Sequence, residues 1–392
     1  MLFRSTFDLG FQRGATASAT VNLVGDVGES NPSHWIGNLS EGDAVHVVLS
    51  LWVTEDPVVM EKVTAELRAA FAGGLRELSS HDARAMSDNR VHFNYRDNIA
   101  QPTVSGAPPR KHAVPDAQPV VSTGEFLLGY PNESGAEYWV EPPELSKNSS
   151  YSSFRILEQD VAGFETFLAT YSKQAGIEPE ALAAKVCGRW RNGNPLELMP
   201  DSMGDPLPTT QINDFSYVSR DPVSDDTLGL KCPIGSHIRR NNPRDGAVVG
   251  TDATHHRIVR RAMPYGPDYD PKKPDPAPRG LIGHFINGSI TNQFEFLMGQ
   301  WDNSPDFVKS ATGVDAGCLG NAVFNISGSD VFLGVNDPSS SSFTLPACGK
   351  GGKENVTIKG FDRLIVTRGG AYCFLPSITG LKYLASLPSP PE

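Results

Sequence analysis

The segment Cys232-Pro-Ile-Gly-Ser-His237-Ile-Arg-Arg-Asn-Asn-Pro-Arg244 sets a histidine directly before closely spaced arginines. Between residues 237 and 261 the chain has six arginines and two aspartates, although its formal net charge as a whole is −11. Neighbouring guanidinium groups suit planar, two-point recognition of a carboxylate or a phosphate. The segment therefore indicates an anionic ligand near His237, while ion pairing with the surplus acidic residues of the chain explains the same charges more simply.

A carboxylate is the favoured anion, because the sequence lacks both common phosphate-binding patterns. Neither GxxxxGK[ST] nor a GxGxxG motif that opens a helix occurs in the chain. The acidic balance of the whole chain also opposes nonspecific binding to nucleic acid or to an anionic membrane surface. We therefore expect no nucleic-acid partner.

Length and composition describe a folded, soluble protein. The 392 residues, 39% hydrophobic and 20% charged, predict two domains or one domain with large insertions. Five cysteines without a CxxC pair argue against a zinc ribbon or a dense disulfide framework. The longest mostly apolar stretch, residues 44–53, is about half of the roughly 20 residues that a membrane-spanning helix needs. We expect no membrane partner.

The order of the predicted elements indicates an α+β fold, because strands and helices do not alternate regularly. A hairpin-like turn is predicted at Gly369-Gly370, and long proline-rich connections are predicted over 101–122, 192–232 and 264–278. The apolar patterns predict strands at 45–53, 124–130, 151–157, 281–286, 363–367 and 371–375, and helices from 57, 158, 178, 290 and 377.

The segment from Cys232 to Arg244 resembles the haem-ligand segment of dye-decolorizing peroxidases. The stretch His92-Phe-Asn-Tyr-Arg-Asp97-Asn-Ile-Ala-Gln-Pro102 resembles the distal acid motif of that family. The resemblance runs from about residue 20 to the C-terminus and is greatest to the long, fungal-like branch. Further matching segments follow in the order of the family at 124–130, 183–190, 260–266, 279–282, 292–296 and 369–377.

The resemblance implies an α+β fold of two ferredoxin-like domains with antiparallel sheets and one haem b per chain. We expect residues 1–160 to form the N-terminal domain and residues 161–392 to form the haem-binding domain. Family members carry an additional N-terminal segment, so the first domain is expected to be incomplete, with an unpaired sheet edge. Arg4 and Asp8 interrupt any signal peptide. The sequence leaves the compartment open: extracellular if the N-terminus is truncated, and otherwise cytoplasmic.

Three residues match the catalytic positions of the family. His237 is the expected axial ligand of the haem iron, and its second ring nitrogen is expected to donate to an acceptor that the sequence does not identify. Asp97 is the expected distal acid and base for peroxide. Arg260 is expected to stabilise the anion that develops on the leaving oxygen. Without the resemblance, Asp97 would be interpreted as a turn residue and Arg260 as a surface cation.

Other residues are expected to bind the haem. Arg239 and Arg244 flank the ligand and are candidates for the haem propionates, with surface ion pairing as the alternative. Leu281 and Phe294 are candidates for the pocket lining, although core packing explains apolar residues equally well.

The family oxidises bulky dyes through aromatic residues at the surface. Tyr265 and Trp301 are the corresponding candidates for electron transfer here, and core packing is the stronger interpretation for Trp301. Four further histidines, His92, His255, His256 and His284, are expected to be structural.

The sequence departs from the family at the distal motif, which is normally Gly-x-x-Asp-Gly. Asn94 and Asn98 replace the two glycines. Asparagine is the residue next best suited to positive φ, so the backbone shape is expected to persist, with added side-chain bulk beside the haem. Gly283 replaces an aromatic residue of the distal face and is expected to open the cavity.

Three hypotheses follow. The leading one is a haem peroxidase that reduces hydrogen peroxide and oxidises bulky aromatic dyes and phenols by single-electron transfer. The second is a haem-binding protein or degenerate pseudo-peroxidase with weak or no turnover, motivated by Asn94, Asn98 and the missing N-terminal segment. The third sets the resemblance aside and uses the arginines of residues 237–261 in an anion-binding α+β protein.

Overall fold

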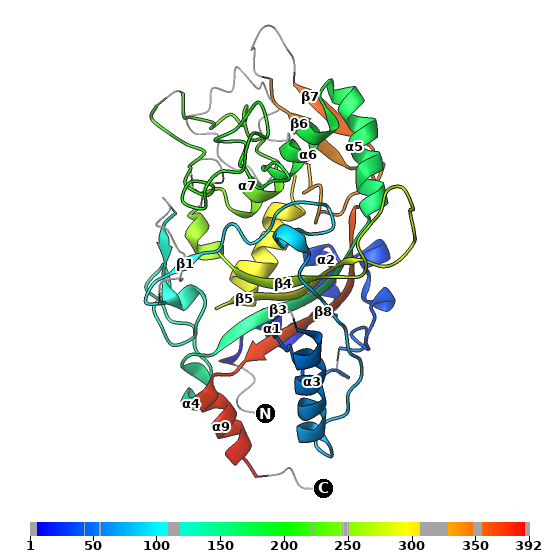
Figure 1. Cartoon of the computed structure of the whole chain (residues 1–392). Helices are drawn as coiled ribbons and strands as arrows, with labels where there is room; N and C mark the ends of the chain where they lie inside the picture. The colour runs from blue at the N-terminus through cyan, green and yellow to red at the C-terminus, as the bar shows by residue number, and fades with distance from the viewer. Residues whose placement is uncertain are drawn as a thin grey trace.

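A four-stranded antiparallel sheet lies at the centre of the computed structural model (Figure 1). The structure describes residues 6–388 except 43, 55, 109–117, 222, 245, 247–248, 250, 306–327 and 348–354. The order of strands in the sheet is β4-β5-β3-β8. Their bounds are Ser150–Gln159 for β3, Val259–Tyr265 for β4, Gly280–Asn287 for β5 and Ile365–Leu375 for β8.

The connections of this sheet are ferredoxin-like. Along the chain, helices follow the first strand, β3, and the third strand, β5, while the second and third strands, β4 and β5, form an antiparallel pair. Leu157 of β3 pairs with Leu281 of β5 on one side and with Thr367 of β8 on the other. The central strand β3 lies before residue 160, so the predicted domain boundary would separate β3 from its partners. A boundary before Ser150 would keep the sheet in one unit.

The predicted helices after β3 are confirmed. Helix α5 (Val161–Ala175) begins where the Asp160 side chain accepts a hydrogen bond from the Gly163 amide, and it ends at Gly176, whose φ is 65°. Its apolar face packs into the core, as the spacing of its apolar residues predicts. Helix α6 (Pro179–Cys187) follows and contacts α5.

The helix predicted from Ile290 is wound as two π-helical segments. These are η7 (Ile290–Phe294), capped by the Ser289 side chain, and η8 (Leu297–Asp302). π-Helical turns are rare and concentrate at functional sites. The end of this helix, at Asp302, is therefore a candidate part of a functional site.

The hairpin predicted at Gly369-Gly370 is wrong, because β8 continues through both glycines. A Cβ atom at Gly369 would lie 2.6 Å from Leu39 Cδ1, and one at Gly370 would lie 2.9 Å from Trp35 Cη2. The glycines thus allow the N-terminal segment to approach the strand closely, rather than forming a turn. The predicted C-terminal helix is present as α9 (Ile378–Ser386), capped by Ser377.

Other sequence-based strand predictions also differ from the structure. Residues 124–130 form turns that begin with a 3₁₀ helix, Thr123–Glu125, and not a strand. Strand β4 was not predicted, because its arginines and Pro264 conceal the alternation of a strand. The hairpin of β6 (Ser342–Leu345) and β7 (Val356–Lys359) was also not predicted.

The N-terminal half is mainly irregular where it is described. Residues 45–53, predicted as a buried strand, form no ladder with any described segment, and Val47 is 57% exposed. An apolar extended segment becomes a strand only beside a partner, which the described residues do not supply. The remaining α-helices and strands of the described chain are α1 (Leu9–Arg13), α2 (Ser18–Val24), α3 (Pro57–Phe71), α4 (Pro143–Ser146), the short parallel pair β1 (Thr103–Val104) and β2 (Val120–Val121) and, further along the chain, α7 (His237–Asn241).

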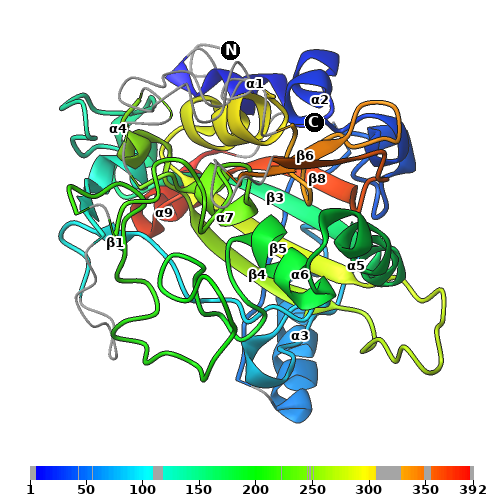
Figure 2. The ribbon, with the colours of Figure 1, turned by 90° about the horizontal axis from the view of Figure 1, so that it is seen from above.

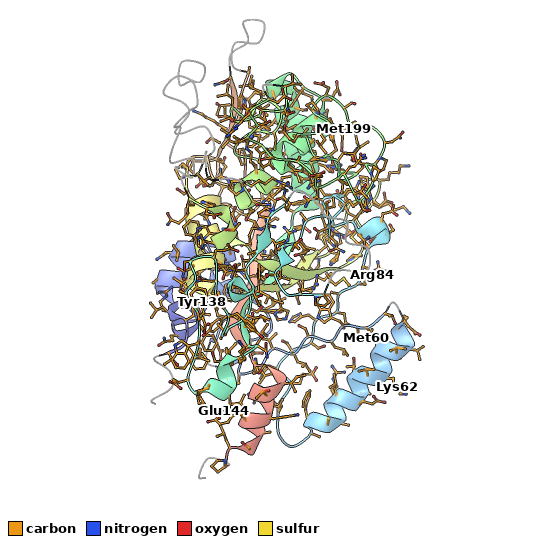
Figure 3. The ribbon with its side chains drawn as sticks, turned by 90° about the vertical axis from the view of Figure 1, so that its left-hand side faces the viewer. Met60, Lys62, Arg84, Tyr138, Glu144 and Met199 are labelled. Carbon is orange, nitrogen blue, oxygen red and sulfur yellow. The ribbon has the colours of Figure 1, made fainter. Side chains whose placement is uncertain are left out.

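Helix α3 is confirmed from the predicted start at Pro57, with Asp56 as its N-cap. None of its residues is buried, and Figure 3 shows Met60 and Lys62 on a helix that stands clear of the sheet.

Within the described part of the chain, no helix is both long and apolar enough to cross a membrane. Cys318 and Cys348 lie outside the described residues.

Candidate active site

A cavity of about 490 Å³ is lined by one face of the sheet, by α7 and by the loop of residues 89–102. Figure 2 shows α7 lying over the strands when the molecule is seen from above. The volume is in the range of cofactor and small-ligand sites. The predicted site residues among its lining are Asp97, His237, Arg244, Arg260, Leu281 and Phe294.

His237 is the first residue of α7 and is held by a buried carboxylate. Its Nδ1 lies 3.1 Å from Oδ2 of Asp330. The other oxygen of Asp330 accepts hydrogen bonds from the amides of Phe332, at 2.9 Å, and Leu333, at 2.7 Å. Burial alone would lower the pKa of His237, but the charge and the hydrogen bond of Asp330 outweigh burial and raise it. Nε2 remains as the ring nitrogen available to the cavity.

Asp330 is the acceptor that the sequence did not identify. Its only local signal is an acid directly before the apolar run Val331-Phe332-Leu333. A hydrogen bond from the second nitrogen fixes the orientation of a ligating imidazole and increases its basicity. The pair of His237 and Asp330 therefore has the chemistry of a metal-binding histidine and its supporting acid.

A second buried carboxylate, Asp302 at the end of η8, lies beside this pair. The ligand atoms of His237, Asp302 and Asp330 lie within 4.8 Å of one another. Asp302 Oδ1 accepts a hydrogen bond of 2.9 Å from the Asn241 amide group. Burial and the charge of Asp330 raise the pKa of Asp302 to about 7. Because Asp330 already accepts from the imidazole and two amides, the set fits orientation of His237 better than direct metal binding by all three.

The loop of residues 89–102, called the distal loop below, has the backbone conformation that was predicted for its two asparagines. Asn94 has φ of 66° and Asn98 has φ of 59°, so both asparagines occupy the left-handed region that glycine favours. The Asn94 side chain accepts a hydrogen bond of 3.1 Å from Arg90 and is outside the cavity lining, whereas Asn98 lines the cavity. Only Asn98 therefore adds side-chain bulk to the cavity.

Asp97 and Arg260 line the same cavity from different elements. Asp97 is solvent-exposed, and its backbone amide donates to Asn89 O at 2.8 Å. Arg260 lies on β4, and its Nη2 donates to Ala100 O at 2.6 Å. The Gln101 side chain binds both the amide and the carbonyl of Arg260, at 3.1 and 3.0 Å. These bonds fasten the distal loop to the sheet.

Arg244 reaches the cavity together with an arginine that the sequence did not identify, Arg189. Both donate to Asn213 Oδ1, Arg244 at 2.7 Å and Arg189 at 3.0 Å. Burial, with a contribution from the Arg244 charge, lowers the pKa of Arg189 to about 10. A bound anion would raise the pKa of Arg189 again, because its charge would offset both the burial and the repulsion from Arg244. The sequence Gly188-Arg189-Trp190 in the matching segment was the available signal.

The prediction that Arg239 binds a propionate is corrected. Its guanidinium group is buried and donates to Asp226 Oδ2 at 2.9 Å and to Cys232 O at 2.6 Å. It also lies 4.3 Å from the centre of the Tyr217 ring and is outside the cavity lining. Two residues beyond His237 on a helix, it faces a different side of α7.

The two proposed surface aromatic residues differ in burial. Trp301 is 3% exposed and packs edge-on to Phe296 and His256, which agrees with core packing and corrects a surface role. Tyr265, at the end of β4, is half-buried. Trp52 was not identified from the sequence, yet it lines the cavity and is 47% exposed.

Gly283 lines the cavity as expected, but the strands explain why the residue is glycine. A Cβ atom there would lie 2.2 Å from Arg261 O and 2.4 Å from Ala262 Cα of β4. A larger residue would therefore require β4 to move. Phe285, two residues further along β5, also lines the cavity.

Three of the histidines that were expected to be structural have contacts of that kind. His92 is bound to Tyr265 O at 2.7 Å, and His256 stacks on Phe296 with ring centres 3.6 Å apart. His284 bonds to two serine hydroxyls, Ser50 at 2.7 Å and Ser152 at 2.8 Å. Among the described residues, His237 is the histidine that lines the cavity.

Known proteins of similar sequence are peroxidases. A dye-decolorizing peroxidase from Mycena epipterygia is 30% identical, and the match covers 97% of this chain and 72% of the relative. A multifunctional dye peroxidase from an Amycolatopsis strain is 28% identical, with 96% of this chain and 78% of the relative covered. No family model matches the chain.

Solved structures share the fold. An ancestral D-type dye-decolorizing peroxidase gives a TM-score of 0.75 at 25% identity, covering 96% of this chain and 80% of that structure. A dye-decolorizing peroxidase bound to 2,6-dimethoxyphenol gives a TM-score of 0.72 at 23% identity, covering 95% of this chain and 80% of that structure. Fold and sequence together define the class as an α+β peroxidase, with the predicted ferredoxin-like antiparallel architecture.

The chain belongs to the dye-decolorizing peroxidase family. It is an oxidoreductase that uses peroxide, so the predictions of family and enzyme class are confirmed. These relatives do not favour the alternatives of a haem-binding protein without turnover or of a simple anion-binding protein.

Proposed function

We propose that the chain binds one haem b and, with hydrogen peroxide, oxidises bulky aromatic dyes and phenols by single-electron transfer. The observation that supports this best is the His237–Asp330 pair, at 3.1 Å, facing a cavity that Asp97 and Arg260 also line. A relative whose structure was solved with 2,6-dimethoxyphenol supports the phenolic class of substrate.

The residues of the cavity fit haem b. His237 offers one imidazole nitrogen, and Asp330 holds the other. Leu281 and Phe294 offer apolar surface to a flat macrocycle, and Arg244 offers a guanidinium group to a propionate. When bound, the haem supplies iron-centred redox chemistry that amino-acid side chains lack.

Asp97 and Arg260 carry the proton and charge movements at peroxide. Asp97 accepts a proton from one peroxide oxygen and returns it to the other, which leaves as water. Arg260, held by Ala100 and Gln101, places a fixed positive charge where negative charge develops on that leaving oxygen. The proposed roles require both residues to act in one cavity, which their positions in its lining support.

Titration of the protein with haemin tests the proposal. We expect the wild-type protein to give a one-to-one complex with a Soret band, and His237→Ala to lose that band. His255→Ala is the matched control, because His255 is outside the cavity lining. A wild-type protein that binds no haem, or a His237→Ala variant with an unchanged spectrum, would contradict the proposal.

A further inference from the structure

Two further arginines, Arg155 and Arg363, line the cavity on the side of the sheet. Arg155 of β3 lines the cavity and is 3% exposed. It pairs with Gly283 on one neighbouring strand and with Gly370 on the other. A Cβ atom at Gly370 would lie 2.7 Å from Arg155 Nη1, so this glycine leaves room for the guanidinium group.

The guanidinium group of Arg155 is fixed but only partly satisfied. Its Nη1 donates to Asp26 Oδ2 at 2.6 Å, and its centre lies 5.9 Å from the Trp35 ring and 5.3 Å from the Phe294 ring. Its Nη2 and the Oδ1 atom of Asp26 are both buried, and neither has a hydrogen-bond partner among the described residues. Buried donors without a partner are rare in folded proteins, so this nitrogen points to a missing acceptor.

Arg363 adds a second positive charge to this wall. It also lines the cavity, and its guanidinium nitrogens donate to Ile365 O at 2.9 Å and to Val27 O at 3.3 Å. Both acceptors are neutral carbonyls. Asp26 forms an ion pair with Arg155 and also acts electrostatically on Arg363, whereas Glu295 is paired with Arg13 at 2.5 Å. The cluster thus holds two guanidinium groups against one carboxylate.

We propose that Arg155 and Arg363 form a carboxylate-binding subsite in the sheet wall of the cavity. A carboxylate is favoured over a neutral acceptor because it matches the fork of a guanidinium group and neutralises the excess charge. The carboxylate comes either from a haem propionate or from a free aromatic acid that enters the cavity. The first source rests on the proposed function, and the second does not.

Two probes separate these sources. Haemin and haemin dimethyl ester, which lacks free carboxylates, are titrated into the apoprotein and followed by the Soret band. Benzoate is titrated calorimetrically into the apoprotein and into the haem-loaded protein. The variants are Arg155→Met and Arg363→Met. Arg368→Met is the control. Arg368 follows the cavity residue Thr367 on β8, but it pairs with Glu158 and is itself outside the cavity lining.

If a propionate occupies the subsite, both variants weaken haemin binding by roughly 10- to 100-fold and leave the dimethyl ester unaffected. If a free acid occupies it, both variants weaken benzoate binding by a similar factor and leave haemin unaffected. Arg368→Met is expected to change neither affinity.

Equal affinities of the wild-type protein and both variants for haemin and for benzoate would overturn the subsite. If the protein binds no haem, the proposed function fails, while benzoate binding to the apoprotein still decides the subsite. If Arg155→Met does not fold, by circular dichroism, Arg363→Met decides alone, because that side chain is half-buried and loses only bonds to backbone carbonyls.

Discussion

The wall of the cavity that carries His237 and the wall that carries Asp97 are held in different ways. His237 faces Asp330, which is fully buried and bound by two amides. Asp97 lies in an exposed loop between two residues at positive φ. The wall with His237, called the proximal wall below, is therefore held rigid by buried polar contacts. The wall with Asp97, called the distal wall, depends on the conformation of a loop. We infer that cofactor binding depends on the first wall and reaction with peroxide on the second.

The largest effect is expected on the distal wall. Asp97→Asn and Arg260→Leu should each slow the reaction with peroxide by about 10²- to 10⁴-fold, because each removes a proton carrier or a fixed charge at the reacting oxygens. Haem affinity should stay within a few-fold of wild type. Stopped-flow absorbance measures the rate. Asp88→Asn, in the same region but outside the cavity lining, is the control. A similar loss of haem affinity would abolish the distinction between the walls.

The stability of the proximal wall should depend on Arg239 without any effect on ligand binding. Arg239→Met leaves Asp226 as a buried carboxylate without its 2.9 Å ion pair, so we expect a loss of about 3–5 kcal/mol in the free energy of unfolding. The folded fraction should bind haemin with unchanged affinity. Urea unfolding and haemin titration test the two parts. A selective loss of haemin affinity would instead support the sequence-based prediction that Arg239 binds a haem propionate.

A smaller effect is expected at the partner of the imidazole. Asp330→Asn should lower haem affinity by about 10- to 100-fold, because the amide no longer fixes the orientation and basicity of His237. Haemin titration measures the affinity, and resonance Raman spectroscopy of the iron–histidine stretch measures the basicity. Asp362→Asn, an exposed acid, is the control. An unchanged stretching frequency would show that Asp330 does not act through His237.

The smallest effects are expected at the two asparagines. Asn94→Gly and Asn98→Gly each relieve a positive φ but loosen the unfolded chain, so stability should change by no more than about 1 kcal/mol. Only Asn98→Gly should speed the reaction with peroxide, because only Asn98 lines the cavity. Thermal unfolding and stopped-flow rates compare the pair. Equal rate changes in both variants would mean that backbone shape, rather than side-chain bulk, limits access.

The same contrast explains which parts of the site could be predicted. His237, Asp97 and Arg260 lie in short segments that resemble motifs of the family, so the resemblance made them candidates, and all three line the cavity. Asp330 lies 93 positions from His237, and no local pattern links the two. Arg239 and Arg244 are both arginines beside the ligand, and only the turn of α7 and the position of Asp226 separate a structural ion pair from a cavity residue.

The fold shows a similar division. Helix α5 and strand β5 were predicted because their apolar spacing is local. Residues 45–53 have the composition of a strand, yet they form none with the described residues, because a strand needs a neighbour that composition does not provide.

The sequence by itself determined the α+β class and the family, and it made His237, Asp97 and Arg260 candidate site residues. It also determined the positive φ of Asn94 and Asn98, because steric preference acts within one residue. Only the tertiary structure decided the acceptor of His237, the loss of Arg239 from the cavity and the placement of Arg155 against two glycines. These are contacts between distant segments, and their free energy depends on distances and burial that exist only after the chain has folded.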